Sequence, residues 1–267
     1  MTTPNPLSSS PDDIWRGIRG VFCDIDDTIT TNGRLTAGVF DAMERLRAAG
    51  LLCVPITGRP AGWCDMIARQ WPVDAVVGEN GAFYFRYDEA ARRMIRTYAD
   101  CSETRARNAR KLEAIRDEVL VAVPGAAVSA DQAFRISDLA IDFCEDVVPL
   151  DRADIRRITE VFARHGATAK VSSIHVNGWF GDFDKLTMTK RLMAEQFATD
   201  LDTDADRFTF IGDSPNDAPM FRFFPNAVGV ANLRELLDQC DAAPAWITAH
   251  ARGAGFCELA DRILTLK

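Results

Sequence analysis

The chain has 267 residues, of which 39 are acidic and 31 basic, so its formal net charge is −8 at pH 7. A hydrophobic share of 47% and a charged share of 26% are ordinary for a soluble globular protein, and they exclude a disordered chain, a collagen and a coiled coil. The negative charge argues against duplex DNA or an anionic lipid surface as the main partner, because both favour a basic protein face.

Short apolar runs alternate with amphipathic stretches in the first third of the chain. We expect strands near residues 21–23, 51–56 and 75–77, and helices at 40–48 and 63–71. Continuous apolar strands separated by helices are typical of a parallel sheet that helices cover on both faces.

The middle of the chain follows a different pattern, in which strands come in pairs. We expect helices at 105–121 and 155–163, and strands at 82–86, 94–98, 126–130, 139–143 and 169–179, the last of them broken near Ser172 and Ser173. The strands at 126–130 and 139–143 are expected to be half-exposed. Paired strands with helices on one side indicate a separate α+β layer.

The first pattern returns near the C-terminus, with a helix at 186–197, a strand at 208–211, a short helix around Met220, a strand at 227–230 and final helices. We therefore expect an α/β protein with a Rossmann-like parallel-sheet core and an inserted α+β domain. The predicted boundaries are a flexible N-terminal tail at 1–17, a core at 18–86 and 184–267, and the inserted domain at 87–183.

The cysteines and the terminal segment bear on the location of the protein. Seven scattered cysteines without a C-x-x-C pair, and only three histidines, predict neither a disulfide framework nor a zinc site. No apolar run approaches the roughly 18–20 residues that a membrane span needs, and residues 1–13 lack the regions of a signal peptide. We expect a cytoplasmic protein that binds neither membrane nor nucleic acid; its oligomeric state is not predicted.

The first strand runs directly into the acidic sequence Asp24-Ile25-Asp26-Asp27-Thr28. In an open parallel sheet, ligands bind beyond the carboxyl ends of the strands, and this cluster lies at such an end. Asp24 and Asp26 are two residues apart, so in an extended chain they share a face and repel each other unless a cation or a proton lies between them. A solvated acidic turn or a helix cap is the alternative interpretation of this cluster alone.

A second apolar strand ends in Gly212-Asp213-Ser214-Pro215-Asn216-Asp217. Asp217 alone could simply stabilise the N-terminus of the next helix. Two strands of one parallel sheet that are both followed by acidic residues nevertheless predict a cation site. Oxygen ligands with no histidine or cysteine nearby favour Mg²⁺, which keeps several waters and binds substrate phosphate.

Residues suited to hold an anion lie between these two clusters. Thr57 and Gly58 follow the apolar strand at 51–56, and a hydroxyl with free backbone amides at the start of a helix forms an anion site. Lys185 would supply a point charge for phosphoryl oxygens. Lys190 is a rival for this role, but it lies inside the predicted helix, where a solvated position is the simpler interpretation.

Together these segments resemble the motifs of the haloacid dehalogenase (HAD) superfamily of phosphohydrolases, in order and in spacing: Asp24-x-Asp26-x-Thr28, Thr57, Lys185 and Gly212-Asp213-x-x-Asn216-Asp217. The stretch Gly78-Glu79-Asn80-Gly81-Ala82 resembles the entry to the cap domain in the type IIB subgroup, which contains the Cof-type and sucrose-phosphate phosphatases. The gap from Asp24 to Thr57 is too short for a cap, whereas the gap from Thr57 to Lys185 is long enough for the large cap of this subgroup. One departure is Leu186, where many relatives have glycine after the lysine.

The resemblance implies a Mg²⁺-dependent phosphatase that works through an aspartyl-phosphate. In that scheme Asp24 is the nucleophile, and Asp26 protonates the leaving alkoxide and then takes a proton from water. The metal ligands implied are Asp24, Asp213, Asp217 and the main-chain carbonyl of Asp26. The phosphate-binding residues are Thr57, Gly58 and Lys185.

Caps of this kind choose the leaving group, which in relatives is often a sugar, so the expected substrate is a small phosphorylated metabolite such as a sugar phosphate. His175, Asn177 and Trp179 alternate along a predicted strand and would project on one face, where they could bind a sugar. Packing of His175 and Trp179 within the cap core is the simpler and preferred interpretation. Further substrate candidates are Arg59, Asn80 and Arg135.

Two other functions remain open at this point. A mutase of the phosphomannomutase kind resembles the same core and cap and returns the phosphoryl group to the sugar. A non-catalytic role in binding a metabolite or a protein is disfavoured, because grouping unneeded carboxylates is electrostatically costly.

Overall fold

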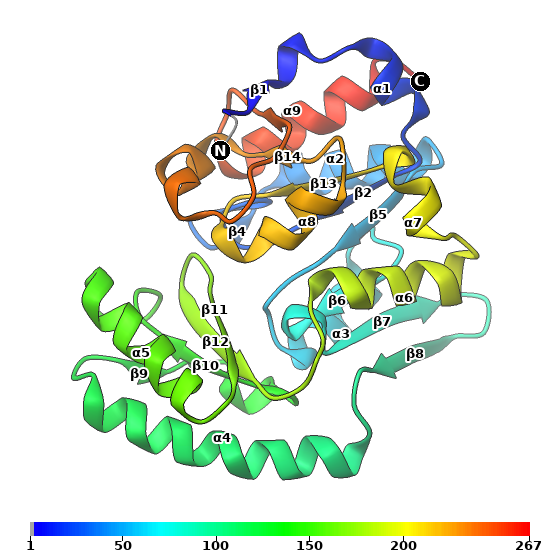
Figure 1. The fold of residues 1–267 in the computed structure, drawn as a ribbon. Coiled ribbons are helices and arrows are strands. Elements are labelled where there is room, and N and C mark those ends of the chain that lie inside the picture. Colours follow the sequence, from blue (N-terminus) through cyan, green and yellow to red (C-terminus); the bar gives the residue numbers. More distant parts are fainter. Residues whose placement is uncertain (1–2) are drawn as a thin grey trace.

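A computed structural model describes residues 3–267, which form a central parallel sheet and a second, antiparallel sheet with its own helices (Figure 1). Met1 and Thr2, the start of the predicted tail, lie outside the described residues. Between Thr3 and Lys267 the structure contains no helix that combines the length and the apolarity needed to cross a membrane.

The central sheet confirms the predicted parallel α/β core. Its strand order is β1-β15-β14-β13-β2-β5, and every neighbouring pair runs parallel. The strands are β1 (Asn5–Pro6), β15 (Trp246–Ile247), β14 (Val228–Gly229), β13 (Phe208–Gly212), β2 (Gly20–Cys23) and β5 (Leu52–Pro55). The central strands β2 and β13 are buried throughout, which explains why their sequences are apolar without alternation.

Helices cover both faces of this sheet, because successive side chains of a strand point to opposite faces. Val21 and Cys23 belong to the same hydrophobic cluster as α2 (Ala37–Ala48), α3 (Ala61–Gln70) and α9 (Arg252–Leu264). Phe22 lies in the opposite cluster, with α6 (Lys185–Phe197) and α8 (Ala218–Phe223). Shorter elements of this half are α1 (Asp12–Gly17), α7 (Leu201–Asp204), β3 (Thr30–Thr31) and β4 (Arg34–Leu35).

An antiparallel extension follows β5 at the edge of the core. Ile56 forms a parallel bridge with Val77 of β6 (Val76–Gly78), and β6 pairs with β7 (Phe83–Asp88), which pairs with β8 (Arg93–Tyr98). The predicted domain boundary at residue 87 therefore falls inside β7. The division into domains itself stays a prediction.

The second sheet has the order β11-β12-β10-β9, with antiparallel pairing throughout. Its strands are β11 (Thr168–Val171), β12 (His175–Trp179), β10 (Asp138–Asp142) and β9 (Ala127–Val128). The helices α4 (Ser102–Ala122) and α5 (Arg152–Arg164) pack on one face, around Ile141 and Val176. His175 and Asn177 alternate with Val176, so they lie on the opposite face, as the spacing predicts.

Two expectations about burial are wrong. The predicted flexible tail is structured from residue 5 onwards: β1 pairs with β15, and Trp15 is fully buried and donates to the Ser10 hydroxyl at 2.7 Å. The strand expected to be half-exposed at 139–143 is β10, which is buried along its whole length. Both corrections arise from tertiary contacts that local composition does not encode.

Candidate active site

The carboxyl ends of β2 and β13 bring two of the predicted acids together. Asp24 follows β2 and Asp213 follows β13, and the two strands are parallel neighbours with Ile211 paired to Cys23. The amide of Asp24 also donates to the carbonyl of Ile211 at 2.9 Å, which extends the pairing by one residue. The parallel register of these neighbouring strands thus places the two carboxylates side by side.

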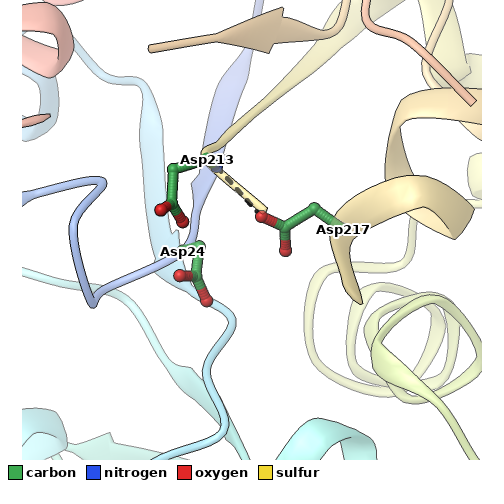
Figure 2. A group of neighbouring side chains, drawn as sticks. All are labelled: Asp24, Asp213 and Asp217. Carbon is green, nitrogen blue, oxygen red and sulfur yellow. Dashed lines mark hydrogen bonds between the residues drawn. The ribbon is translucent and has the colours of Figure 1, made fainter. Parts of the chain in front are cut away.

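Asp217 completes an acidic triad with Asp24 and Asp213 (Figure 2). Each of the three offers one carboxylate oxygen, and these oxygens lie within 4.8 Å of one another. Asp217 reaches the other two because the turn Pro215–Asp217 folds back, so that its Oδ2 accepts the Asp213 amide at 3.1 Å. Gly212 is required here, since a Cβ at that position would lie 2.3 Å from the same oxygen.

Lys185 supplies a positive charge at the triad. Its Nζ donates to Oδ1 of Asp24 and to Oδ1 of Asp217, both at 2.7 Å, and the side chain is 3% exposed. Lys185 is the first residue of α6, where Asp184 caps the helix by accepting the Thr187 amide at 2.7 Å. Lys190, the rival, lies on the surface of the same helix and pairs with Asp202.

The turn Glu79–Gly81 fixes the start of α6 and therefore Lys185. Gly81 has a φ of +107°, and a Cβ there would lie 2.0 Å from the carbonyl oxygen of Asp184. Only glycine permits this backbone-to-backbone approach. The close approach of this turn to Asp184 thus explains why position 81 is a glycine.

The charges of the triad favour a bound cation. Burial raises the pKa of Asp24 to about 7; Lys185 opposes this rise, and Asp217 and Asp26 add to it. Burial, together with Asp24 and Asp217, raises the pKa of Asp213 well above its usual range. Burial lowers the pKa of Lys185, but Asp217 and Asp24 outweigh it and raise the value. One ammonium cannot balance three carboxylates, so a divalent cation with a preference for oxygen ligands fits this set.

Asp213 has two further partners at the site. The hydroxyl of Thr28 donates to its Oδ1 at 3.2 Å, and Asn232 Nδ2 donates to its Oδ2 at 3.4 Å. Sequence reasoning missed Asn232. It follows β14, the next strand of the sheet, so the same rule about carboxyl ends could have pointed to it.

The carboxylate of Asp26 is bound by Arg59. Nε of Arg59 donates to Oδ2 at 2.9 Å and Nη2 donates to Oδ1 at 2.8 Å, in a two-pronged arrangement. The three carboxylates whose oxygens lie within 4.8 Å of one another belong to Asp24, Asp213 and Asp217. The Asp26 carboxylate is instead held by Arg59.

The predicted phosphate-binding loop follows β5. Ile56 donates its amide to the carbonyl of Cys23 at 2.8 Å, which keeps this loop beside Asp24. Thr57 is buried, and its hydroxyl accepts the Arg59 amide at 3.0 Å. Gly58 borders the same cavity as Asp24.

The second sheet closes over this edge of the core. The cavity between them has a volume of about 10 Å³ and is lined from the core by Asp24, Asp26, Gly58, Arg59 and Asn216, and from the other side by Arg135, Ser172, Ile174, His175 and Asn177. Such a volume holds about one water molecule. The cavity in this arrangement is therefore too small for a phosphorylated metabolite.

The predicted substrate residues have different surroundings in the structure. His175 and Asn177 line the cavity, whereas Trp179 stacks on Phe183 with ring centroids 5.7 Å apart and packs in the core. Asn80 is buried beside Gly58, and among residues 3–267 its Nδ2 finds no hydrogen-bond partner. All three guanidinium nitrogens of Arg59 contact carboxylates, so it is a poor candidate for a substrate ligand.

Sequence reasoning missed the acids that join the two sheets. Glu79 is fully buried and accepts the amides of Ile136 and Ser137, and burial, with Asp138 nearby, raises its pKa to about 8. Glu145 meets Arg59 at 2.6 Å. Glu79 belongs to the stretch Gly78-Glu79-Asn80-Gly81-Ala82, which resembles the entry to a cap domain, whereas no sequence pattern marks Glu145.

Comparison with known proteins gives one match to a family model. The model described as haloacid dehalogenase-like hydrolase matches residues 21–107. None of the curated proteins compared with the chain matches it.

Solved structures share the fold of nearly the whole chain. The C-terminal domain of trehalose-6-phosphate phosphatase from C. albicans has a TM-score of 0.71 at 12% identity, with 100% of both chains covered. The sucrose-phosphatase from Synechocystis sp., in complex with sucrose and phosphate, has a TM-score of 0.62 at 14% identity, covering 91% of this chain and 97% of the other. The HAD subclass IIB sugar phosphatase BT4131 has a TM-score of 0.61 at 14% identity, covering 93% and 100%.

Proposed function

Because the model of haloacid dehalogenase-like hydrolases matches residues 21–107 and the chain shares its fold with a subclass IIB sugar phosphatase, we propose that it is a phosphatase of this kind, which hydrolyses the phosphate monoester of a sugar or of a similar small metabolite. The observation that carries this proposal is the convergence of Asp24, Asp213, Asp217 and Lys185 at one edge of the sheet. The sugar-phosphate substrates named for the structural relatives support the choice of leaving group.

The proposed cofactor is Mg²⁺, held by Asp24, Asp213, Asp217 and the main-chain carbonyl of Asp26. When bound, Mg²⁺ neutralises the repulsion between the nucleophilic carboxylate and the phosphate dianion. The buried negative charge of the triad supports this assignment, since Lys185 pairs with Asp24 and Asp217 and leaves Asp213 without a cationic partner among the described residues.

The proposed reaction has two steps on this chain's own residues. In the first, an Asp24 oxygen forms a bond to phosphorus while the bond from phosphorus to the sugar oxygen breaks, and Asp26 gives its proton to the leaving oxygen. In the second, Asp26 takes a proton from a water molecule that attacks the aspartyl-phosphate, which releases phosphate and restores Asp24. Thr57, Gly58 and Lys185 would hold the phosphoryl oxygens.

The division of the chain and its location are proposed on separate grounds. We assign the segment from α4 to β12 to a cap and the rest to the core, with the first junction after β8, because β8 continues the sheet of β6 and β7. The seven cysteines, all of them within residues 3–267, are free, which supports a reducing compartment such as the cytoplasm.

A phosphate-release screen over sugar phosphates, with and without Mg²⁺, tests the proposed function. We expect Asp24→Asn to lower the rate by a factor of about 10³ or more. The protein should stay folded, because the change removes a buried charge and keeps the shape. Asp206→Asn, on an exposed residue, is the matched control and should leave the rate unchanged.

Three outcomes of the screen would contradict the proposal. The first is Asp24→Asn turning over at the wild-type rate, and the second is full turnover in excess chelator. The third is a requirement for a hexose bisphosphate with little free phosphate released, which would indicate a mutase.

A further inference from the structure

Arg59 links the second acid of the first motif to the opposite sheet. Its Nη2 donates both to Oδ1 of Asp26, at 2.8 Å, and to Oε1 of Glu145, at 2.6 Å. Asp26 belongs to the core, whereas Glu145 follows β10 of the second sheet. One guanidinium group therefore touches a proposed catalytic carboxylate and the element that closes over it.

The geometry leaves Arg59 little freedom. Its guanidinium lies over the Trp63 ring, 4.5 Å from the centroid, and its remaining nitrogen, Nη1, reaches Asp131 at 3.3 Å. The residue is 4% exposed. Since all three nitrogens of the group contact carboxylates and one of its faces lies on Trp63, the position of Arg59 is fixed by its neighbours, and it in turn fixes Asp26.

Glu145 is itself held in place by two contacts. Its amide donates to the Asp142 carboxylate at 2.8 Å, which anchors the loop after β10. Its Oε2 lies 2.9 Å from Nε2 of His175. Burial would raise the pKa of Glu145, but His175 and Arg59 lower it to about 2, so the side chain is charged at neutral pH and can attract Arg59.

Both oxygens of Asp26 accept from the guanidinium fork, so this pair fixes the direction in which the carboxylate points. In the second half of the proposed reaction Asp26 takes a proton from water, and that transfer depends on the orientation of the carboxylate. Arg59 is the residue that sets this orientation.

We propose that Arg59, held by Glu145 of the second sheet, is a positioning residue that sets Asp26 as the base for hydrolysis of the aspartyl-phosphate. In this step Asp26 takes one proton from water, the water oxygen bonds to phosphorus, and the bond between phosphorus and Asp24 breaks with its electron pair returning to Asp24. The inference rests on the proposed function and adds that a contact from the second sheet, through Glu145 and Arg59, orients the base.

The test separates the two half-reactions with labelled p-nitrophenyl phosphate, whose phenolate leaves without needing a proton. Release of nitrophenolate in the first turnover measures the first step. The decay of the acid-trapped phosphoenzyme after a chase with unlabelled ester measures the second. We expect Arg59→Gln to slow this decay by about 10²-fold, the usual contribution of a general base, and to change the first step less than about threefold.

Glu145→Gln should act in the same direction with a smaller effect, about tenfold on the decay, because it loosens Arg59 without removing it. The Glu145→Gln variant also tests the inference if the Arg59→Gln protein fails to fold. In the steady state both variants should lower kcat and KM together while kcat/KM stays constant. Glu160→Gln, the same change on the exposed face of α5, is the matched control and should alter neither step.

Equal slowing of both steps would overturn the inference in favour of a structural role. A rise in KM with an unchanged decay rate would overturn it in favour of a substrate ligand. If no phosphoenzyme forms in the wild type or in Asp26→Asn, the proposed aspartyl-phosphate route itself fails, and the inference falls with it. If the phosphoenzyme forms and decays at the wild-type rate in both variants, only the inference fails.

Discussion

At the residue scale, the site depends on the balance between three buried carboxylates and one lysine. Lys185 contacts Asp24 and Asp217 at the same distance, 2.7 Å, so it offsets part of the repulsion between them. Removing one partner of a buried ion pair costs more than the pair contributes, because the other partner keeps its charge without compensation. The lysine is therefore expected to matter for folding as well as for chemistry.

Lys185→Met should abolish phosphate release and, in a chelator, lower the free energy of unfolding by about 3–5 kcal/mol. Saturating Mg²⁺ should recover more stability in the variant than in the wild type, because it supplies the missing positive charge. Thermal unfolding with and without Mg²⁺ measures both effects. Lys190→Met, at a partly exposed lysine of α6 that pairs with Asp202, is the control; an equal loss in the two variants would contradict the special position of Lys185.

The stability of the metal-free protein should depend on pH through Asp24. Its pKa is raised from 3.8 to about 7, mainly by burial, so between these values the folded chain keeps a proton that the unfolded chain has released. Stability in a chelator should then fall as pH rises from about 4 to about 7. Mg²⁺ displaces that proton, so its stabilising effect should grow over the same interval.

Calorimetry at several pH values, with Mg²⁺ or with chelator, measures this dependence. Asp24→Asn has no proton to lose at this position, so its stability in a chelator should vary less with pH. A Mg²⁺-induced rise in Tm that is constant across the interval would contradict the raised pKa.

At the scale of elements, the turn Glu79–Gly81 positions α6 against the sheet. Gly81 has a positive φ and lies against the backbone of Asp184, so neither the conformation nor the space tolerates a side chain. The position of Lys185 is thus set partly by a turn that lies about a hundred residues earlier in the chain.

Gly81→Ala should lower the free energy of unfolding by about 3 kcal/mol or more and reduce activity, because strain at positive φ adds to a backbone clash. Gly50→Ala is the matched control. It also has a positive φ, but it has open space around it, so it should cost only about 1 kcal/mol and leave activity unchanged. Similar losses in the two variants, measured by chemical denaturation, would contradict the role given to the contact with Asp184.

The strands and helices of the core were predictable because the polarity of their residues reflects how each one is buried. Strands buried on both faces are apolar throughout, and acids after β2 and β13 must meet when those strands are parallel neighbours. The burial of β10 was not predictable in this way. One of its faces packs on α4 and α5, and the acids on its other face are covered by nearby polar groups: Arg135 and Asn177 bind Asp138, and the amides of residues 144–146 bind Asp142.

At the scale of the whole molecule, the parts that sequence reasoning missed lie where the two sheets meet. Arg59 was expected to contact substrate, yet it binds Glu145 and Asp131 across this junction. The Glu145 and Asp131 positions follow no periodic pattern, and their contacts with Arg59 depend on how the second sheet docks on the core. The metal-binding edge, in contrast, lies within one sheet, and strand order alone determines it.

A crystal grown with Mn²⁺ in place of Mg²⁺ tests most directly whether Asp24, Asp213 and Asp217 hold one divalent cation. Mn²⁺ accepts the same oxygen ligands and is visible by its anomalous scattering. We predict a single anomalous peak about 2.1 Å from carboxylate oxygens of Asp24 and Asp213, with Asp217 nearby, and its loss in Asp213→Asn. A peak elsewhere on the molecule, or no peak at a saturating concentration of Mn²⁺, would contradict the proposed metal centre.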